Sequence, residues 1–305
     1  MKQFLYAFLI VLIPVLLWSC KNKKEGVTIG VSYQNLQNEF IINLQDAVRK
    51  KAKELNVTLV EADGQGKAEN QISQVENFVS MGVDAVILNP FDKDGSAPAV
   101  IRATEAGIPV VVMNAIVSNL SSANAYVGSD DYEAGRIAAQ KIADTLHGTG
   151  NIVIIHGAFA HSAELQRTEG IKQILKKYPG IKIVFEQTAN WEREKGLSLM
   201  ENILSMGKEI NAVIAQNDEM ALGAYKAIEA AGKQTQILVI GIDAIPDALN
   251  SVKEGKMIAT VFQDARSQGA LSVELAQQLI SGKKVNHTNH IPFQLVTKEN
   301  VSKFE

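Results

Sequence analysis

Cysteine is almost absent from this sequence, since Cys20 is the only one among 305 residues. A single cysteine excludes an internal disulfide bond. An excess of either charge is also missing, because the formal net charge is −3, and this excludes the basic surface that nucleic acid binding requires. With 46% hydrophobic and 21% charged residues and no low-complexity segment, the composition is that of an ordinary globular protein, long enough for one large core or two moderate ones.

The amino end carries the one long apolar run, from Phe4 to Leu17, after the cation Lys2. The run is short for a membrane span of about 20 residues, which favours a signal sequence. It ends in Leu17-Trp18-Ser19-Cys20, which resembles a bacterial lipobox with a bulky Trp18. We therefore expect residues 1–20 to be a lipoprotein signal peptide, Cys20 to be lipidated, and residues 21–26 to be a tether. An uncleaved anchor is the alternative, and both place the globular part outside the cytoplasm.

After residue 26 the chain alternates short β-rich runs with segments of helical periodicity. Strands that are separated by helices of about 10–15 residues indicate parallel sheets built from right-handed βαβ units. There are too many such units for one sheet, so the sequence predicts two Rossmann-like lobes joined by a hinge of several segments. We place the first lobe at residues 27–128 plus 264–292 and the second at residues 129–263 plus 293–305.

The predicted strands of the first lobe lead into polar or aromatic residues. Asn38 and Phe40 lie at the mouth of the first helix, while Asn89 and Asn114 end two later strands. Ligands of open α/β sheets lie beyond the carboxyl ends of strands, and asparagine amides both donate to and accept from hydroxyl groups. Asparagine is also common in turns and helix caps, so for these three residues the sequence leaves structure and ligand binding about equally favoured.

The second lobe contributes further polar candidates. The apolar run Ala212-Val213-Ile214 ends in Ala215-Gln216-Asn217-Asp218, and Asp243 follows another predicted strand. Trp191 lies in a polar loop, where it either packs beneath the loop or offers a flat apolar face to a sugar ring opposite Phe40. Gln263 lies at a predicted hinge segment, within reach of the same ligand.

Other chemistry is poorly represented. His156 and His161 do not have helical metal-ligand spacing, and no cysteine or histidine cluster accompanies them, so we expect no metal. A phosphate-binding glycine loop, a full dinucleotide fingerprint and a serine in a nucleophile elbow are also missing from the sequence. We therefore expect no cofactor and no enzymatic activity. Asp92, Asp94, Asp130 and Asp131 are expected to cap helices or face solvent.

Several motifs in residues 27–300 together resemble the ribose-type periplasmic sugar-binding proteins. They are Asn38 and Phe40 before Leu44-Gln45-Asp46, Asn89-Pro90, Gly128-Ser129-Asp130, Arg167 with Glu169-Gly170, Lys195-Gly196-Leu197, Asn217-Asp218-Glu219-Met220, Gly241-Ile242-Asp243, and Gln263. The resemblance implies the periplasmic-binding-protein-like fold of class I. It also implies sugar contacts from Asn38, Phe40, Asn89, Trp191, Asn217, Asp243 and Gln263, to which position adds Asn114.

Some positions depart from the ribose-type pattern. Where ribose binders carry an Asp-Arg pair, this chain has Asn114-Ala115, and a second sugar-binding arginine falls on Leu165. Two further aromatic contacts are replaced by Ile41 and Ile242. Planar guanidinium donors discriminate strongly among hydroxyl patterns, so their loss disfavours ribose. A different monosaccharide, a polyol or a modified sugar fits the remaining residues better.

The resemblance implies the solute-binding component of an ABC sugar importer, with a membrane permease as partner and a lipid anchor on Cys20. The ligand binds between the lobes, which close by hinge motion, and we expect a monomer. A binding protein that presents sugar to a chemoreceptor or histidine kinase is the alternative. A repressor of the lactose type requires a helix-turn-helix where this chain has its signal sequence, so that class is disfavoured.

Overall fold

The computed structural model describes residues 26–304, and the predicted signal peptide with Cys20 lies outside the described residues. The strands are β1 (Val27–Tyr33), β2 (Val57–Asp63), β3 (Ala85–Leu88), β4 (Val110–Asn114), β5 (Ala125–Gly128), β6 (Thr149–His156), β7 (Gly180–Thr188), β8 (Ala212–Ala215), β9 (Leu238–Asp243), β10 (Ala259–Phe262), β11 (Thr288–His290) and β12 (Gln294–Thr297). The helices are α1 (Glu39–Glu54), α2 (Ala68–Met81), α3 (Ala97–Glu105), α4 (Asp131–Thr145), α5 (Ser162–Leu175), α6 (Arg193–Ser205), α7 (Asp218–Ala230), α8 (Pro246–Lys253) and α9 (Ala265–Ile280), with 3-10 turns at Leu120–Ser122 and Val301–Lys303.

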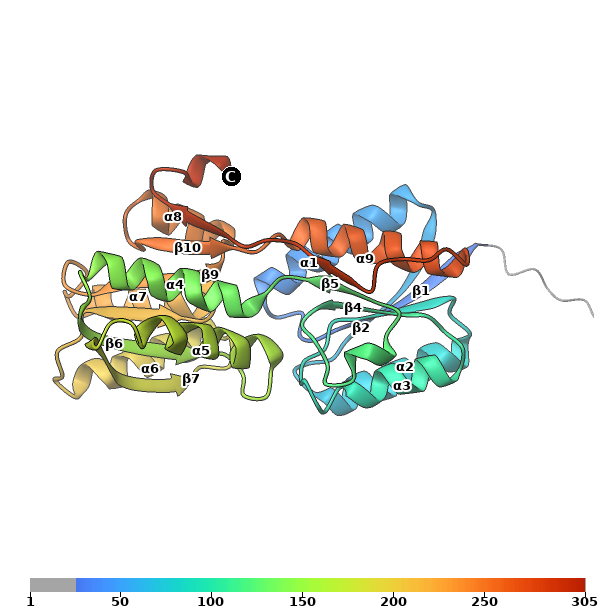
Figure 1. Cartoon of the computed structure of the whole chain (residues 1–305), viewed down its shortest axis with the longest axis horizontal. Coiled ribbons are helices and arrows are strands. Elements are labelled where there is room, and N and C mark those ends of the chain that lie inside the picture. Colours follow the sequence, from blue (N-terminus) through green and yellow to red (C-terminus); the bar gives the residue numbers. More distant parts are fainter. Residues whose placement is uncertain (1–25, 305) are drawn as a thin grey trace, which may run out of the picture.

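The strands form two six-stranded sheets, one in each lobe (Figure 1). Their orders are β11-β5-β4-β3-β1-β2 and β12-β10-β9-β8-β6-β7, so the second sheet repeats the arrangement of the first. Neighbouring strands are parallel, except that β12 runs antiparallel to β10. The predicted fold of two parallel-sheet α/β lobes is confirmed.

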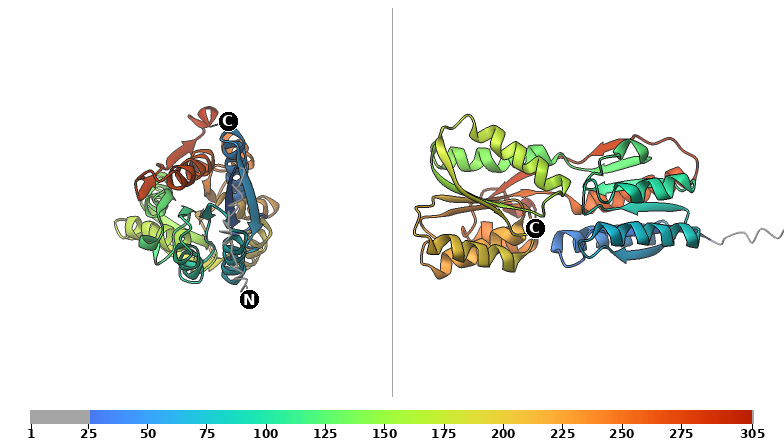
Figure 2. Two further views of the ribbon diagram at one scale, coloured as in Figure 1. Left: turned by 90° about the vertical axis from the view of Figure 1, so that its right-hand side faces the viewer. Right: turned by 90° about the horizontal axis from the view of Figure 1, so that it is seen from below.

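Helices cover both faces of each sheet (Figures 1 and 2). In the first lobe α1 packs against α9 and α2 against α3, and in the second α4 packs against α5 and α6 against α7. The central strands β3 and β8 are apolar and buried along their whole length, as in β3, where Ala85, Val86, Ile87 and Leu88 are all buried. Continuous burial is expected of parallel strands that lie between two helical layers.

The chain passes between the two sheets at three places, which lie between the lobes in Figures 1 and 2. These crossings are residues 129–130, residues 263–264 and residues 291–293. Helix α9 returns to the first lobe, and Gln294–Thr297 is already a strand of the second sheet. The exact residue at which each lobe begins stays a prediction. Across residues 26–304, every helix is too short or too polar to cross a bilayer.

Candidate ligand-binding site

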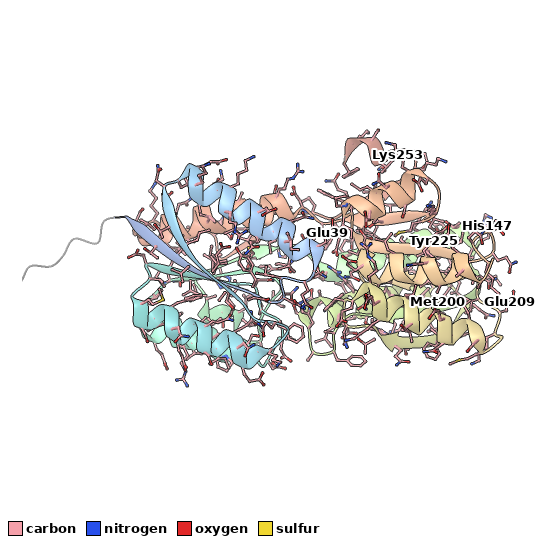
Figure 3. The ribbon with its side chains drawn as sticks, turned by 180° about the vertical axis from the view of Figure 1, so that it is seen from behind. Glu39, His147, Met200, Glu209, Tyr225 and Lys253 are labelled. Carbon is pink, nitrogen blue, oxygen red and sulfur yellow. The ribbon has the colours of Figure 1, made fainter. Side chains whose placement is uncertain are left out.

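Each sheet has a point where the strand order reverses, between β1 and β3 in the first lobe and between β6 and β8 in the second. The connections from these strands leave in opposite directions, which opens a crevice at their carboxyl ends. The two crevices face each other across the gap between the lobes, and the predicted ligand residues come from the loops that follow these and the neighbouring strands. Figure 3 shows Glu39, at the first residue of α1, on the side of the first lobe that faces the second.

Asn89 is completely buried and its amide is already used by the protein. Its Oδ1 accepts from the Gln34 backbone N–H at 3.2 Å, while its Nδ2 donates to the Met113 carbonyl and to Asn114 Oδ1, both at 3.3 Å. Both N–H bonds of the amide thus have protein partners. Asn89 positions the loops around the site, and its predicted direct ligand contact stays a prediction.

Asn114 and Asn38 retain unused hydrogen-bonding capacity. Asn114 Nδ2 donates to Gln268 Oε1 at 3.1 Å, which leaves its second N–H. Asn38 is the N-cap of α1, where its Oδ1 accepts from the Ile41 backbone N–H at 3.3 Å. Its Nδ2 donates to none of the described residues. A cap role and a ligand role are therefore compatible at Asn38, because they use different atoms of one amide.

In the second lobe Asn217 likewise caps a helix with its amide oxygen and keeps an amide N–H for a ligand. Its Oδ1 caps α7 by accepting from the Met220 backbone N–H at 3.0 Å. One N–H of its amide donates to the backbone carbonyl of Trp191 at 3.2 Å. The other N–H remains for a ligand.

Trp191 is held in a strained loop. Asn190 and Trp191 have φ of 53° and 69°, in the left-handed region that L-residues rarely adopt, and such strain clusters at ligand clamps. The indole lies directly on Gly157, where a Cβ atom would be 1.9 Å from Trp191 Cζ2. Only glycine at position 157 leaves room for the ring. The indole Nε1 is buried and has no hydrogen-bond partner in residues 26–304.

Arg167 supplies the buried guanidinium of the site. Its Nε donates to Asp131 Oδ1 at 2.8 Å, its Nη2 donates to Gln263 Oε1 at 3.1 Å, and its Nη1 donates to the Gln216 carbonyl. Asp131 is 3% exposed, so the prediction that this residue caps a helix or faces solvent was wrong, whereas Asp130 does cap α4. A buried carboxylate requires a charged partner, and Arg167 provides it.

Asp243 is the buried carboxylate without a close partner. The nearest cationic atom, Arg167 Nη1, is 4.0 Å from its Oδ1, and no N–H or O–H of residues 26–304 lies within hydrogen-bonding distance of the carboxylate. Burial raises the pKa of Asp243 well above its usual range, Arg167 opposes this, and Asp218 adds to it. The residue has φ of 127°, so its backbone, like those of Trp191 and Asn114, lies in the region that L-residues rarely adopt. A ligand that donates hydrogen bonds would relieve this carboxylate.

The site still contains a guanidinium, that of Arg167, although this chain lacks the sugar-binding arginines of ribose binders. Leu165, which replaces a sugar-binding arginine of ribose binders, is 45% exposed, and Ile41 and Ile242 belong to the hydrophobic cores. The site therefore contains one guanidinium, and protein acceptors use most of its N–H groups. Gln263 is also anchored, because its Oε1 accepts from Arg167, but its Nε2 is buried without a partner among the described residues.

Sequence reasoning missed Gln34 in the gap between the lobes and could not place its partner His161. His161 Nε2 and Gln34 Oε1 are 2.6 Å apart, although one residue belongs to each lobe. The sequence offered His161, with Arg167 and Glu164, as near enough to compensate for the missing arginines, but did not fix its position. Within the described residues no group of three or more His, Cys, Asp or Glu side chains is placed to hold a metal ion. Neither residue has a local sequence signal, because their contact depends on how the lobes meet.

A separate groove of about 600 Å³ lies beside the hinge. Its lining includes Ile116, Tyr126, Asp130, Tyr132 and Glu169, and none of the eight predicted ligand residues. Among the predicted residues, Asn89, Asn114, Asn217, Asp243 and Gln263 are all buried. The lobes are in contact with each other, because His161 meets Gln34 and Ser162 accepts from the Ile116 backbone N–H.

Comparison with known proteins gives consistent matches over nearly the whole folded part. The family model described as periplasmic binding protein domain matches residues 29–284. A candidate rhizopine-binding protein of Rhizobium meliloti is 40% identical over 91% of this chain and 92% of its own length. The ribose import binding protein RbsB of Bacillus subtilis (strain 168) is 38% identical over 91% of this chain and 89% of its own.

A solved structure is similar at the level of the whole fold. An ABC transporter solute binding protein from Bacillus halodurans C-125, crystallised with bound myo-inositol, superposes with a TM-score of 0.90 and 43% identity. The match covers 93% of this chain and 99% of that protein.

Proposed function

This chain belongs to the periplasmic binding protein domain family, and we propose that it is the binding component of an ABC importer for a neutral cyclic polyol or monosaccharide. Relatives of the chain are binding proteins of this kind, for ribose in one case and with bound myo-inositol in another. The family is extracytoplasmic, and its members bind solutes rather than transform them.

The observation that carries the proposal is the set of unused polar atoms in the gap between the lobes. Gln263 Nε2 and Trp191 Nε1 are buried donors without a partner in the described residues, and Asn38 and Asn217 retain amide N–H groups. Among residues 26–304, Asp243 is the one buried carboxylate that lacks a close donor. Hydroxyl groups satisfy both kinds of atom, because each hydroxyl accepts and donates. A ligand with its own carboxylate or phosphate would add a negative charge beside the buried Asp243 carboxyl, whose pKa burial and Asp218 already raise, in a site where protein acceptors hold the Arg167 guanidinium.

A cyclic polyol fits better than ribose. Leu165 and Ala115 stand where ribose binders carry arginines, and the remaining guanidinium of Arg167 is held by Asp131, Gln216 and Gln263. Neutral amides then make most of the ligand contacts, with Trp191 under the ring. The myo-inositol bound by the similar protein of Bacillus halodurans supports this choice.

Binding follows from closure of the two lobes. The ligand first meets the amides at the strand ends of one lobe, and closure then adds contacts from the other. Since only the closed form has both sets of contacts, the ligand shifts the population toward it. The permease recognises this closed form, and the free protein is a monomer anchored by lipid at Cys20.

A ligand screen tests the proposal. Residues 21–305 are heated with myo-inositol, other inositols, pentoses, hexoses and sugar alcohols, and each hit is titrated by calorimetry. A ligand that binds only the folded state raises the melting temperature by mass action, by several degrees at 100 times its Kd. We expect myo-inositol or another cyclic polyol to give the largest shift. The absence of any shift with neutral polyols and sugars would refute the proposal.

Three variants connect the shift to the site. Asn217→Ser retains an oxygen that caps α7 but loses the amide donor, whereas Asn217→Ala loses both. We expect both variants to weaken binding at least tenfold, with Asn217→Ser retaining more of the thermal stability. Asp243→Asn should abolish binding of a neutral polyol. Unchanged affinity in Asn217→Ser and Asp243→Asn would show that the ligand binds at another place in the protein.

The lipid anchor has its own test. Cells that express the full chain are labelled with radioactive palmitate, and the wild type is compared with Cys20→Ser. We expect label and membrane association in the wild type alone. Retention of the label in Cys20→Ser would refute lipidation at this residue.

A further inference from the structure

Three successive residues of the second lobe make hydrogen bonds to the first. The Ala160 carbonyl accepts from the Lys93 backbone N–H at 3.0 Å, His161 Nε2 meets Gln34 Oε1 at 2.6 Å, and Ser162 Oγ accepts from the Ile116 backbone N–H at 2.9 Å. Their partners lie in three different loops of the first lobe, after β1, β3 and β4. We call residues 160–162 the latch segment.

The hydrogen bonds of His161 determine its protonation state. Nδ1 accepts from the Ala163 backbone N–H at 3.1 Å, where the imidazole caps α5. A backbone N–H cannot accept, so Nδ1 carries no proton. Gln34 Oε1 accepts, so the proton is on Nε2 and donates across the gap. His161 is therefore the neutral Nε2–H tautomer when the lobes are together.

The ring of His161 also contacts both lobes. It meets Trp191 edge-on, with centroids 5.2 Å apart and ring planes at 72°, and it meets Phe91 of the first lobe at 6.4 Å and 71°. His161 is 3% exposed. Since Gln34 and Phe91 belong to the other lobe, opening the gap would expose one side of the imidazole to water while its contact with Trp191 remains.

We propose that His161 is a positioning residue that couples closure of the lobes to the placement of Trp191, through its neutral Nε2–H bond to Gln34 and its edge contact with the indole. This rests on the proposed function for the identity of the ligand. The hydrogen bonds of the latch segment form when the lobes close, and closure is measurable without ligand.

Protonation of His161 opposes closure. A proton on Nδ1 would face the Ala163 N–H, and burial followed by the charge of Arg167 lowers the pKa of His161 from 6.5 to about 3. The side chains that hydrogen-bond to the ring or meet it as aromatic neighbours are uncharged, namely Gln34, Phe91 and Trp191, while Lys93 approaches the segment through its backbone. In the open form the side of the imidazole that faces Gln34 and Phe91 is hydrated, so the pKa of His161 is higher than in the closed form, although Ala163 and Arg167 of its own lobe still lower it. Below the pKa of the open form, closure therefore releases a proton.

The first experiment measures closure without ligand. Residues 21–305 contain no cysteine, so Lys53→Cys on α1 and Lys226→Cys on α7, both exposed, accept a pair of dyes for single-molecule energy transfer. We expect His161→Leu and Gln34→Leu each to lower the equilibrium constant for closure about tenfold. Gln37→Leu, on an exposed residue of the same loop, is the control and should change nothing. If neither His161→Leu nor Gln34→Leu changes the equilibrium constant for closure, the proposal is overturned.

The second experiment measures binding of myo-inositol and, in parallel, D-ribose. Trp191 is the only tryptophan of residues 21–305, so its fluorescence reports the indole directly. We expect Gln34→Leu and His161→Leu each to weaken binding about tenfold, and the double variant to be no weaker than the worse single variant. Additive losses would show that the two residues act independently. If none of the polyols and sugars of the screen binds to the wild type, the proposed function fails, while the dye experiment still decides the latch.

The pH dependence of the affinity shows whether His161 acts through its neutral Nε2–H bond or only by filling space. His161→Gln retains a neutral donor but cannot be protonated in this range. We expect the affinity of the wild type, divided by that of His161→Gln, to fall as pH is lowered from 7 to 4.5, with a slope that approaches tenfold per pH unit below the pKa of the open form. The exposed His287→Gln serves as control and should follow the wild type. A constant ratio would show that His161 does not titrate with closure.

Discussion

The guanidinium of Arg167 lies between two aromatic rings, with its Cζ atom 5.7 Å from the centroid of Trp191 and 5.9 Å from that of Phe293. Cations over aromatic faces are attracted by the ring quadrupole, more strongly when water is excluded. Phe293 belongs to the last crossing between the lobes, and Gln263, which accepts from Arg167, belongs to the second. Arg167 therefore connects Trp191, which we expect to lie against the ligand ring, with two of the hinge segments.

Arg167→Met should be among the most destabilising single changes in the second lobe. It leaves Asp131 buried without its cationic partner, and breaking a buried ion pair from one side costs about 3–5 kcal/mol. Urea unfolding of the ligand-free protein measures the loss. Arg167→Lys keeps the charge but loses the planar fork, so we expect an intermediate loss. A loss below about 1 kcal/mol for Arg167→Met would show that Asp131 finds other donors.

Gly157→Ala tests whether the space beside Gly157 is needed to place the Trp191 indole. An alanine Cβ would overlap Trp191 Cζ2, and the ring has to move away from the site. We expect the affinity for polyol to fall more than tenfold while the free energy of unfolding falls by about 1–3 kcal/mol, the usual cost of overpacking. Gly170→Ala is the comparison, because its Cβ would be 2.1 Å from the Tyr132 carbonyl oxygen, far from the indole. That variant should lose stability and keep the emission maximum of Trp191.

Asp218 gives the ligand-free protein an unusual pH dependence. Burial raises its pKa to about 7, although Thr260 and the Ile245 N–H donate to it. A carboxyl with a folded-state pKa above its unfolded value of about 3.9 takes up a proton on folding, so its contribution to stability grows as pH falls from about 7 to about 4. All these partners belong to the second lobe, so closure is not involved.

The measurement compares urea unfolding of the wild type and Asp218→Asn from pH 8 to pH 4.5. The difference between their free energies of unfolding should shift in favour of the wild type as pH falls, by up to about 1.4 kcal/mol per pH unit. Asp247→Asn, on an exposed carboxylate of the same lobe, is the matched control. Parallel curves for the wild type and Asp218→Asn would place the titration on another group.

The architecture was accessible from the sequence because local patterns dictate it. Apolar runs such as Ala212-Val213-Ile214 are long enough for buried strands, and asparagines at 38 and 217 begin the helices that follow their strands. Parallel strands and short connections leave few alternative topologies. The two lobes and the position of the site at the strand ends follow from these patterns.

The hydrogen bonds within the site were not accessible in the same way. Asn89 was identified, but only the structure shows that Gln34, Met113 and Asn114 use its whole amide. The error over Asp131 has the same origin, because an acidic residue after Asp130 reads as part of a helix start. Its partner Arg167 is 36 residues away, and no periodicity connects them. Contacts between lobes, such as His161 with Gln34, depend on closure and have no local signal.

Glu39 and Arg193 provide a last pair that meets across the gap. Arg193 of the second lobe donates to Glu219 and Asp247, and its Nη2 lies 3.9 Å from Glu39 Oε2 of the first lobe. Closure thus brings a third carboxylate to one guanidinium. Burial, then Glu219 and Asp247, raises the pKa of Glu39, while Arg193 lowers it. Glu219 and Asp247 belong to the second lobe, so we expect their repulsion of an ionised Glu39 to oppose closure against the attraction of Arg193.

Glu39→Gln should therefore tighten polyol binding at pH 7, by about two- to fivefold at low salt, and Arg193→Met should weaken it by a similar factor. Arg193 is 40% exposed, so salt screens these charges, and both effects should shrink in 0.5 M sodium chloride. The advantage of Glu39→Gln should also vanish at acid pH, where the wild-type carboxyl is neutral. Calorimetric titration at two salt concentrations and two pH values measures all of this. Weaker binding by Glu39→Gln at low salt would show that attraction to Arg193 outweighs the crowding of carboxylates.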